Sequence, residues 1–457
     1  MTTYSIIQKS QLEGALRLDA EYYQPGYLNL ISNLKSQKSK TLGEIGRVAY
    51  GTTPSGGVFE KSGIPFVRSQ NFSNLLIDTS DLAFCSEKFH NQNKKSAIKP
   101  DDILFAAVGA TIGELAIVQD EIKEGNINQN IAAVRITDKN INSYFVGFFF
   151  ASTSGQLQIE RLITGNAQPY LNSEQIKSFL IPIFDIKRQN EIANYFHEIQ
   201  EQTKTSKSLY SQAENLLLEE LGLRDFEVED DLSYIVNLSE IKSSHRVDAE
   251  YFQPKYEKIF EFIKSPIKKL EEITKFLNHA KQPPYVDDGE IPIITQRHLG
   301  NAFLNLEAIN EPDTKFTSEA WLKKYPKYQL KSGDILYYSV GAYIGKTNIV
   351  FENLKATAAS FITIIRPKEE VDPVYLTVVL NSVVGQLQSE KWQSATAQQY
   401  IYPKDIKNFK IPILPKPTQQ KIADLVQKSH EARKKAKELL EEAKQKVENA
   451  IENEINK

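Results

Sequence analysis

One stretch of sequence occurs twice in this chain, as Arg17-Leu-Asp-Ala-Glu-Tyr-Tyr-Gln-Pro25 and again as Arg246-Val-Asp-Ala-Glu-Tyr-Phe-Gln-Pro254. Three further blocks recur in the same order: Asp102-Ile-Leu-Phe-Ala-Ala-Val-Gly-Ala-Thr-Ile-Gly113 with Asp334-Ile-Leu-Tyr-Tyr-Ser-Val-Gly-Ala-Tyr-Ile-Gly345, Gly155-Gln-Leu-Gln158 with Gly385-Gln-Leu-Gln388, and Ile176-Lys-Ser-Phe-Leu-Ile-Pro-Ile183 with Ile406-Lys-Asn-Phe-Lys-Ile-Pro-Ile413. The nearly constant spacing indicates that the 457 residues are two tandem copies of one unit.

The segments between the matched blocks differ widely in the two copies. A shared framework with different inserts suits two readers of different targets. Generic divergence after a duplication would leave the same pattern, so the pattern alone does not decide between the two.

Each copy predicts an α+β fold. A short β-like stretch and a helix that opens near Ser10 or Ser239 come first. Short apolar runs broken by Gly, Pro, Asn and Ser follow, and residues 64–68, 103–108 and 132–136 are typical of strands. Helical patterns lie between them, as over residues 142–163.

Each copy closes with a long helix, over about residues 190–221 and 419–453, whose apolar positions follow a heptad rhythm. One stripe is rich in Ala and the other carries aromatic residues, which favours close packing of the two helices on each other; two separate amphipathic helices are the alternative. At 1.5 Å per residue the first helix is about 45–50 Å long. The helix-pairing candidates are Ile192, Phe196, Ile199, Tyr210, Leu217, Ile422, Leu425, Ala432, Ala436 and Leu439. The predicted parts are a first recognition domain at 1–185, a central helix at 186–222, a second recognition domain at 232–415 and a C-terminal helix at 416–457.

Composition sets limits on the kind of protein. The net charge of −3 gives no general attraction to nucleic acid, although a local basic groove can lie within such an average. The single cysteine, Cys85, excludes a disulfide framework within the chain and a thiolate zinc cluster. No apolar run reaches the length of about 18 residues that a membrane span needs. We therefore expect a cytoplasmic protein.

The doubled blocks resemble the specificity subunits of type I restriction–modification systems, and the resemblance covers nearly the whole chain. In that family, two target-recognition domains are separated by a central and a C-terminal helix, which pair as an antiparallel coiled coil. The resemblance implies a bipartite double-stranded DNA site, two copies of a methyltransferase subunit as partners, and restriction subunits bound through them. It also implies that S-adenosylmethionine is bound by the methyltransferase and that this chain needs no cofactor.

Motifs for catalysis are weak. Gln282-Pro-Pro-Tyr285 is close to the catalytic motif of adenine methyltransferases but has Gln where Asn or Asp is required, so a turn is expected there. Residues 108–113 lack the Lys-Ser/Thr of a phosphate-binding loop, which favours a tight turn between strands. The six histidines show no metal-ligand spacing. The repeated Arg17 and Asp19 are expected to form structural ion pairs that fix each domain to the long helices. We therefore expect a chain that is not an enzyme and holds no metal.

Direct readout of DNA needs polar side chains that loops present to the base edges. The candidates of the first half are Thr52, Thr53, Ser55, Arg68, Gln70, Asn71, Thr111, the polar run Asn126, Asn128, Gln129 and Asn130, and Gln168 with Tyr170. Those of the second half are Lys281, Gln282, Tyr285, Gln296, Arg297, His298, Tyr343, Lys346, Gln398, Gln399 and Tyr400. Arg68 and Arg297 suit guanine, and Gln70 and Gln296 suit adenine. The repeated Gln and Tyr positions have a framework role as their alternative.

Three functions stay open at this point. The first is a DNA-sequence reader in a methyltransferase or restriction complex, including related DNA-modification systems. The second is a self-contained adenine methyltransferase or nuclease. The third is a coiled-coil adaptor that binds only proteins.

Overall fold

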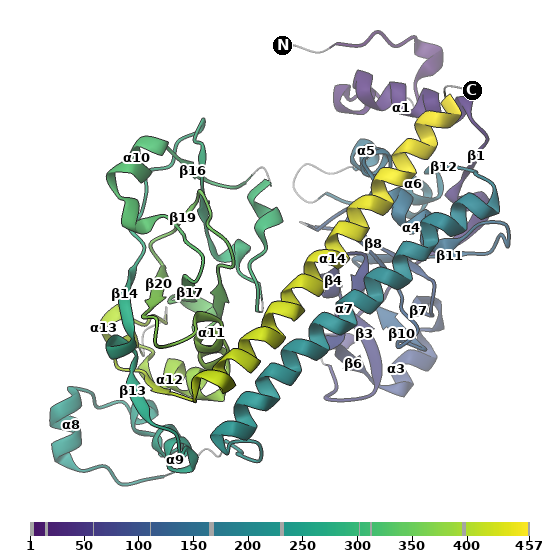
Figure 1. The fold of residues 1–457 in the computed structure, drawn as a ribbon. Helices are drawn as coiled ribbons and strands as arrows, with labels where there is room; N and C mark the ends of the chain where they lie inside the picture. The colour runs from purple at the N-terminus through teal and green to yellow at the C-terminus, as the bar shows by residue number, and fades with distance from the viewer. Residues whose placement is uncertain are drawn as a thin grey trace. The chain divides into compact units, whose positions relative to one another are not determined.

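The computed structural model describes residues 4–13, 17–57, 59–109, 111–163, 169–228, 233–300, 302–310, 313–394 and 399–455 (Figure 1). The chain forms two compact units. The first unit is Met1–Lys204 with Arg433–Lys457, and the second is Thr205–Ala432. Each unit therefore contains a segment of both long helices, a sharing that the predicted division of the chain does not include.

The first unit is built on a four-stranded antiparallel sheet of order β2-β11-β8-β9. A second sheet of order β6-β3-β10-β7 has β3 and β10 in parallel, and β1 pairs with β12. The strands are β1 (Ser39–Thr41), β2 (Gly46–Tyr50), β3 (Ile64–Val67), β4 (Phe72–Ser73), β5 (Leu76–Ile77), β6 (Ala83–Cys85), β7 (Ala97–Ile98), β8 (Ile103–Ala106), β9 (Leu115–Ile117), β10 (Gly125–Ile127), β11 (Ile131–Ile136) and β12 (Leu180–Pro182). The helices are α1 (Pro25–Ser36), α2 (Leu42–Ile45), α3 (Glu87–Gln92), α4 (Ser143–Ala151), α5 (Thr153–Leu162) and α6 (Ser173–Lys177).

The second unit repeats this plan. Its four-stranded sheet has the order β14-β20-β17-β18, its second sheet has the order β16-β15-β19 with β15 and β19 parallel, and β13 pairs with β21. The strands are β13 (Ile267–Lys269), β14 (Thr274–His279), β15 (Ile291–Ile294), β16 (Phe316–Thr317), β17 (Ile335–Tyr338), β18 (Thr347–Ile349), β19 (Thr357–Ala358), β20 (Ile362–Pro367) and β21 (Lys410–Pro412). The helices are α8 (Leu238–Ser244), α9 (Lys255–Phe262), α10 (Glu319–Lys324), α11 (Pro373–Asn381), α12 (Val383–Trp392) and α13 (Pro403–Ile406). The predicted repeat and the mixed helix and sheet class are confirmed.

The start of each copy differs from the prediction. The β-like stretch forms no strand in residues 4–8 or 233–237. At Ser10 there is only a short 3-10 turn, Lys9–Gln11, whereas α8 opens beside Ser239 as expected. An isolated strand with no partner strand beside it leaves its backbone groups unpaired, so the apolar pattern is not enough.

The helical pattern over residues 142–163 is two helices rather than one. Ser152 has an extended backbone, ends α4 and precedes α5. The chain turns so tightly here that a Cβ on Gly155 would lie 2.2 Å from the carbonyl oxygen of Phe149. Gly385 meets the carbonyl oxygen of Leu380 at 2.1 Å in the second unit. The glycine of this repeated block is therefore required by backbone approach.

The other repeated blocks also hold the framework. Asp102 is buried and forms an ion pair with Arg135 of the neighbouring strand at 2.5 Å. Gln158 is buried and exchanges two hydrogen bonds with the backbone of Leu180, both at 2.9 Å, which ties α5 to β12. Asp334 with Arg366 and Gln388 with Lys410 repeat both arrangements in the second unit. These side chains recur because each satisfies buried polar groups.

The predicted turn is confirmed for its described residues, 108–109 and 111–113, which lie between β8 and β9. Gly109 and Gly113 have φ of 94° and 92°, a conformation that glycine adopts without strain. Gly341 and Gly345 have φ of 79° and 89° in the corresponding turn.

The repeated arginine near the start of each copy forms the expected ion pair. Arg17 Nε lies 2.6 Å from Asp19 Oδ1, and Arg246 Nη2 lies 2.5 Å from Asp248 Oδ2. The expected link to the long helices is wrong, however, because Arg246 Nη2 donates to the carbonyl of Gln393, directly after α12. The guanidinium of Arg246 therefore links two segments of the same domain, the start of the copy and the end of α12.

The two long helices are α7 (Ile186–Leu221) and α14 (Lys416–Ile455). In the first unit, early α7 and late α14 share one buried cluster, whose members from the predicted set are Ile192, Phe196, Ile199, Ala436 and Leu439. In the second unit, late α7 and early α14 share another, with Leu217 and Ile422 buried and Tyr210 and Leu425 packed against it. Ala432 is also buried. Segments of both helices thus lie in each core, and the coiled-coil geometry stays a prediction.

Polar contacts within each unit follow the same pairing. Arg188 Nη1 lies 3.2 Å from Glu454 Oε1 in the first unit. The buried hydroxyls of Ser206 and Ser429 lie 3.1 Å apart in the second unit. Within the described ranges, none of the helices has both the length and the apolar character that a membrane span requires.

Candidate nucleic-acid interface

In the second unit, four of the predicted DNA-reading side chains line one open pocket of about 560 Å³. The pocket lies where β15 ends, beside the turn between β17 and β18 and the turn between β19 and β20. Its lining residues are Thr295, Gln296, Arg297, Leu299, Tyr338, Tyr343, Lys346 and Phe361. The sequence did not single out Tyr338 and Phe361, because both lie in apolar runs that are typical of core residues.

Electrostatics and packing hold these side chains in place. Arg297 Nη1 lies 3.4 Å from Asp313 Oδ2, and Lys346 Nζ lies 4.5 Å from the centre of the Tyr343 ring. The hydroxyl of Tyr338 donates to Gln296 Oε1 at 2.7 Å. Two cations and one oriented amide therefore meet in one pocket.

The loop after β14 adjoins this region. Gln282 Oε1 accepts from the backbone N–H of Ser360, in the turn between β19 and β20, at 3.2 Å. Lys281 Nζ lies 4.3 Å from the centre of the Tyr325 ring, and its hydrogen bond lowers the pKa of the Tyr325 hydroxyl. Tyr285 is exposed on the same loop.

The first unit brings the corresponding loops together. The hydroxyl of Thr53, after β2, hydrogen-bonds to Gln129 Oε1 in the turn between β10 and β11. The N–H of Thr52 donates to the carbonyl of Ile127 at 3.0 Å. The Thr53–Gln129 contact matches the Gln282–Ser360 contact, so the same two loops meet in both units. Ser55 and Asn128 lie in these two loops, with Ser55 exposed and Asn128 half-buried.

Two candidates are corrected because they are buried and support turns. Asn71 is 2% exposed, and its Oδ1 accepts from the N–H of Arg68 at 2.9 Å. His298 is fully buried, and its Nδ1 accepts from the N–H of Thr295, also at 2.9 Å. Both stand third in a 3-10 turn, where a polar side chain caps the first N–H group. The capping spacing was the signal that could have separated them from DNA-reading residues.

Asn126 of the polar run is also buried, and its Oδ1 lies 2.6 Å from Nδ1 of the buried His90. Its amide nitrogen donates to the hydroxyl of Ser96 at 2.9 Å. Asn130 is half-buried in the turn before β11. Asn126 therefore belongs to the framework of the second sheet.

The matched turns also correct the equivalence of the two arginines. Asn71 and His298 occupy the same place, so Gln70 corresponds to Arg297 and Arg68 to Thr295. Arg68 donates to the carbonyl of Asp81 at 3.1 Å, and Gln70 Nε2 lies 3.4 Å from Asp81 Oδ2. Sequence comparison missed this shift because the offset between the copies drifts outside the matched blocks.

The turns between β8 and β9 and between β17 and β18 share the same backbone hydrogen bonds. The N–H of Ala106 donates to the carbonyl of Glu114, and the N–H of Tyr338 donates to that of Lys346, both at 2.9 Å. Glu114 therefore corresponds to Lys346, as Thr111 does to Tyr343. The charge at this position is negative in the first unit and positive in the second. The sequence already contained this signal, because Glu114 and Lys346 directly follow the repeated blocks that end at Gly113 and Gly345.

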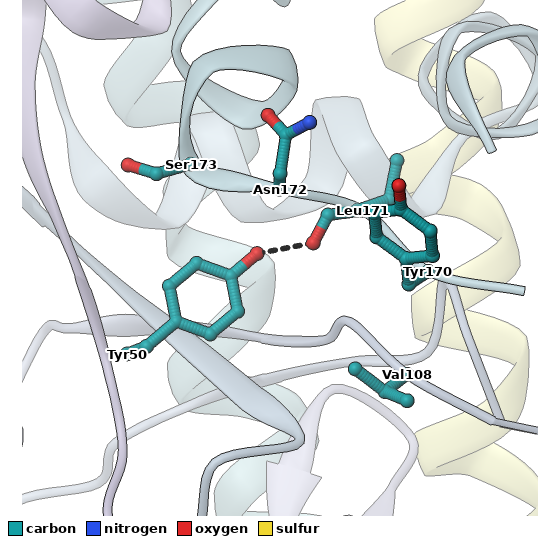
Figure 2. A pocket seen from close by; sticks show the side chains of 6 residues that line it. All are labelled: Tyr50, Val108, Tyr170, Leu171, Asn172 and Ser173. Carbon is teal, nitrogen blue, oxygen red and sulfur yellow. Dashed lines mark hydrogen bonds between the residues drawn. The ribbon is translucent and has the colours of Figure 1, made fainter. Parts of the chain in front are cut away.

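Gln168 and Gln398 lie outside the described residues, and Gln399 is exposed beside them. Tyr170 is 44% exposed and lines a pocket of about 460 Å³ with Tyr50, Val108 and Leu171 (Figure 2). In Figure 2 the hydroxyl of Tyr50 points to the carbonyl of Leu171 and donates to it, and burial raises the pKa of Tyr50 to about 12.

In the second unit, His279 takes the place of Tyr50. Its Nε2 hydrogen-bonds to the hydroxyl of Tyr400, and burial lowers its pKa. Tyr400 and Tyr170 each form a β-bridge, to Val340 and Val108 respectively. The backbones of both tyrosines thus belong to the framework. Tyr170 is exposed, whereas Tyr400 is half-buried.

In the described part of the chain, no cluster of three or more His, Cys, Asp or Glu side chains is placed to hold a metal ion. Cys85 is buried, and burial raises the pKa of its thiol. The loops that meet at the strand ends therefore present polar and cationic side chains, which can form hydrogen bonds and ion pairs with a ligand.

Comparison with known proteins gives the family. The model of the type I restriction modification DNA specificity domain matches residues 35–215 and 264–447. The specificity subunit of the type I restriction enzyme MjaIX from Methanocaldococcus jannaschii is 22% identical over 407 residues, which cover 85% of each chain. The EcoBI specificity subunit from Escherichia coli is 27% identical over 139 residues, 30% of this chain and 29% of that protein.

Among solved structures, the type I restriction–modification S subunit from M. genitalium covers 90% of this chain and 95% of its own, with 15% identity and a TM-score of 0.44. The HsdS subunit from Thermoanaerobacter tengcongensis covers 92% and 96%, with 16% identity and a TM-score of 0.29. Because the family model matches well over half of the residues, once in each copy, the chain belongs to the type I restriction–modification DNA specificity family and is a specificity subunit of that kind.

Proposed function

We propose that this subunit reads a bipartite DNA sequence, with each unit recognising one half-site. The observation that carries the proposal is that the same loops meet at the same edge of both units but present different side chains. Lys346 with Arg297 in the second unit corresponds to Glu114 with Gln70 in the first. A duplicated framework with divergent polar loops is what two readers of unlike sequences require.

The bases between the half-sites are left unread under this proposal. Phosphate contacts from nearby Lys and Arg side chains would hold the duplex and make the affinity depend on salt. The net charge of −3 places that role on local groups rather than on the chain as a whole.

The long helices supply the partner surface in this proposal. α7 and α14 each bury one face and expose a charged one. Each of the two similar units contains a segment of both helices. Two similar surfaces suit two copies of one methyltransferase subunit, with restriction subunits joining through them. The chain itself performs no catalysis, and S-adenosylmethionine binds to the methyltransferase.

Mapping methylated adenine across the genome tests the proposal. Cells that contain this gene and its neighbouring methyltransferase are compared with cells that lack this gene. A two-part motif with an unread spacer, lost on deletion, is the expected result. An unchanged pattern in the deletion strain would contradict a specificity role in that system and favour the adaptor.

A domain exchange sharpens the test. Replacing residues 232–415 by the corresponding domain of another subunit should change one half of the motif and leave the other half intact. A change in both halves would contradict independent reading by the two units. Methylation by the purified chain without its partner would instead support a self-contained enzyme.

A further inference from the structure

The pocket at the end of β15 is rich in hydrogen-bond donors. Arg297 brings the five N–H groups of a guanidinium, and Lys346 brings an ammonium group. Arg297 is itself 40% exposed and Asp313, with which it forms an ion pair, is 81% exposed, so this ion pair contributes little to stability. The pocket therefore favours a ligand edge that consists of acceptors.

Gln296 is held in the orientation that adds another donor. Its Oε1 accepts from the hydroxyl of Tyr338 at 2.7 Å, so its amide NH₂ is the end left for a ligand. Recognition of adenine by glutamine uses the oxygen and the nitrogen of the amide together. The contact with Tyr338 therefore favours an acceptor over adenine at this position, which differs from the adenine preference predicted for Gln296.

The corresponding place in the first unit has the opposite character. Gln70 stands where Arg297 does, and the carboxylate of Glu114 follows the turn where the ammonium of Lys346 does. A carboxylate accepts from the amino groups of cytosine or adenine and repels a phosphate. The second unit therefore favours a base edge that presents hydrogen-bond acceptors, and the first unit favours a base edge that presents donors.

On the basis of the proposed function, we propose that the pocket at the end of β15 reads a guanine in the major groove. Arg297 is the base-reading residue, since a guanidinium matches the O6 and N7 acceptors of guanine with two hydrogen bonds. Lys346 and the amide of Gln296 add donors beside it. Tyr338 is a positioning residue that acts through Gln296.

The test uses the complex of the full chain with its methyltransferase and a pool of DNA with randomised sequence, and the bound DNA is sequenced. Arg297→Ala should abolish a guanine preference at one base of one half-site, with discrimination falling roughly 5- to 150-fold. Arg297→Lys should weaken this discrimination less than Arg297→Ala does and keep most of the affinity, because lysine keeps a charged donor without the planar fork. Lys275→Ala is the matched control for loss of one exposed charge. Lys275 lies at the start of β14, whereas the loop beside the pocket follows the end of this strand, so the selected DNA motif should be unchanged.

A phosphate contact at Arg297 would give a different result. Arg297→Ala would then weaken binding to all sequences equally and lower the slope of log affinity against log salt by about one, with the motif unchanged. That outcome would overturn the inference and leave the proposed function intact. A wild-type complex that selects no sequence would instead overturn the proposed function.

Tyr338→Phe tests the positioning role separately, because it keeps the ring and removes only the hydroxyl. Release of Gln296 Oε1 should allow adenine at the neighbouring base, while affinity for the preferred sequence falls by no more than about tenfold, the net worth of one hydrogen bond. An unchanged base preference would contradict the role of Tyr338. Thermal melting of each variant shows whether the second unit stays folded.

Discussion

The central sheets of the two units contain the same ion pair between a buried aspartate and an arginine, but the arginine side chain is exposed to water to different extents. Asp102 and Asp334 are each 2% exposed, whereas the arginine side chain is 46% exposed at Arg135 and 11% at Arg366. The groups that satisfy the interior are thus the same in both copies, and the outer covering is not. Duplication has kept what buried polar groups require and has let the solvent-facing positions diverge.

The attachment of the long helices differs in the same way. In the first unit, Lys204 of α7 forms an ion pair with Glu121, after β9, at 2.5 Å. In the second unit, His430 of α14 stacks on Phe351, after β18, with ring centres 4.1 Å apart. A polar contact in one unit and an aromatic contact in the other therefore join a long helix to the segment that follows an edge strand of the four-stranded sheet.

The largest expected effect comes from removing the buried aspartates. Asp334→Ala should lower the free energy of unfolding by about 3–5 kcal/mol, because the nearly buried charge of Arg366 loses its ion-pair partner and keeps only hydrogen bonds to the carbonyls of Lys327 and Gln329. Asp102→Ala should cost less, about 1–3 kcal/mol, because water reaches Arg135. Both tryptophans, Trp321 and Trp392, lie in the second unit, so their fluorescence during urea unfolding measures the effect of Asp334→Ala, and circular dichroism measures that of Asp102→Ala in the first unit. Equal losses in the two variants would contradict the role assigned to exposure.

The tight turns should respond equally in the two units. A methyl group at Gly155 or Gly385 would lie 2.2 or 2.1 Å from a carbonyl oxygen, so either Gly→Ala change should cost about 1–3 kcal/mol. Circular dichroism during urea unfolding measures the change. Gly26→Ala in α1 is the control, since nothing lies within 4 Å of its Cβ position. A large difference between Gly155→Ala and Gly385→Ala would show that the matched turns are not equivalent in energy.

The helix attachments should differ in their response to salt. His430→Ala should cost about 1–2 kcal/mol at any salt concentration, because it removes an aromatic stack. Lys204→Ala should cost at most about 1 kcal/mol, since both partners are roughly half exposed, and the loss should vanish in 1 M salt. Urea unfolding at low and high salt compares the two. A salt-independent loss in Lys204→Ala would contradict an electrostatic attachment.

The smallest expected effect is the pH dependence of the same ion pair. Burial raises the pKa of Glu121, but hydrogen bonds from Lys204 and Gln200 outweigh it and bring the pKa below its usual 4.5. A lowered pKa in the folded state gives stability that is present above pH 4.5 and is lost as the pH falls through the folded value. The stabilities of the wild type and Lys204→Ala should therefore converge once the pH lies well below 4.5 and the Glu121 carboxylate is protonated in the folded state. A difference that persists there would contradict the prediction.

The candidate interface was predictable in part. The loops that contain Thr53, Gln129 and Arg297 follow strands in the repeated order, so their place at one edge could be expected. The burial of Asn71 and His298 could not, because a polar side chain in a turn either caps the backbone or points into water, and tertiary packing decides which. The roles of Tyr338 and Phe361 depend on which strands end side by side.

The sequence by itself determined the duplication, the strands β3, β8 and β11, the two long helices and the repeated glycine turn, because these depend on repetition, short-range periodicity and backbone freedom. Only the tertiary structure decided that Gln70 rather than Arg68 corresponds to Arg297, since the offset between the copies drifts in the loops and strand pairing sets the register there. It also decided that α7 and α14 are shared by both units, and that Tyr338 orients Gln296. These properties arise from contacts between residues distant in sequence, which no local pattern encodes.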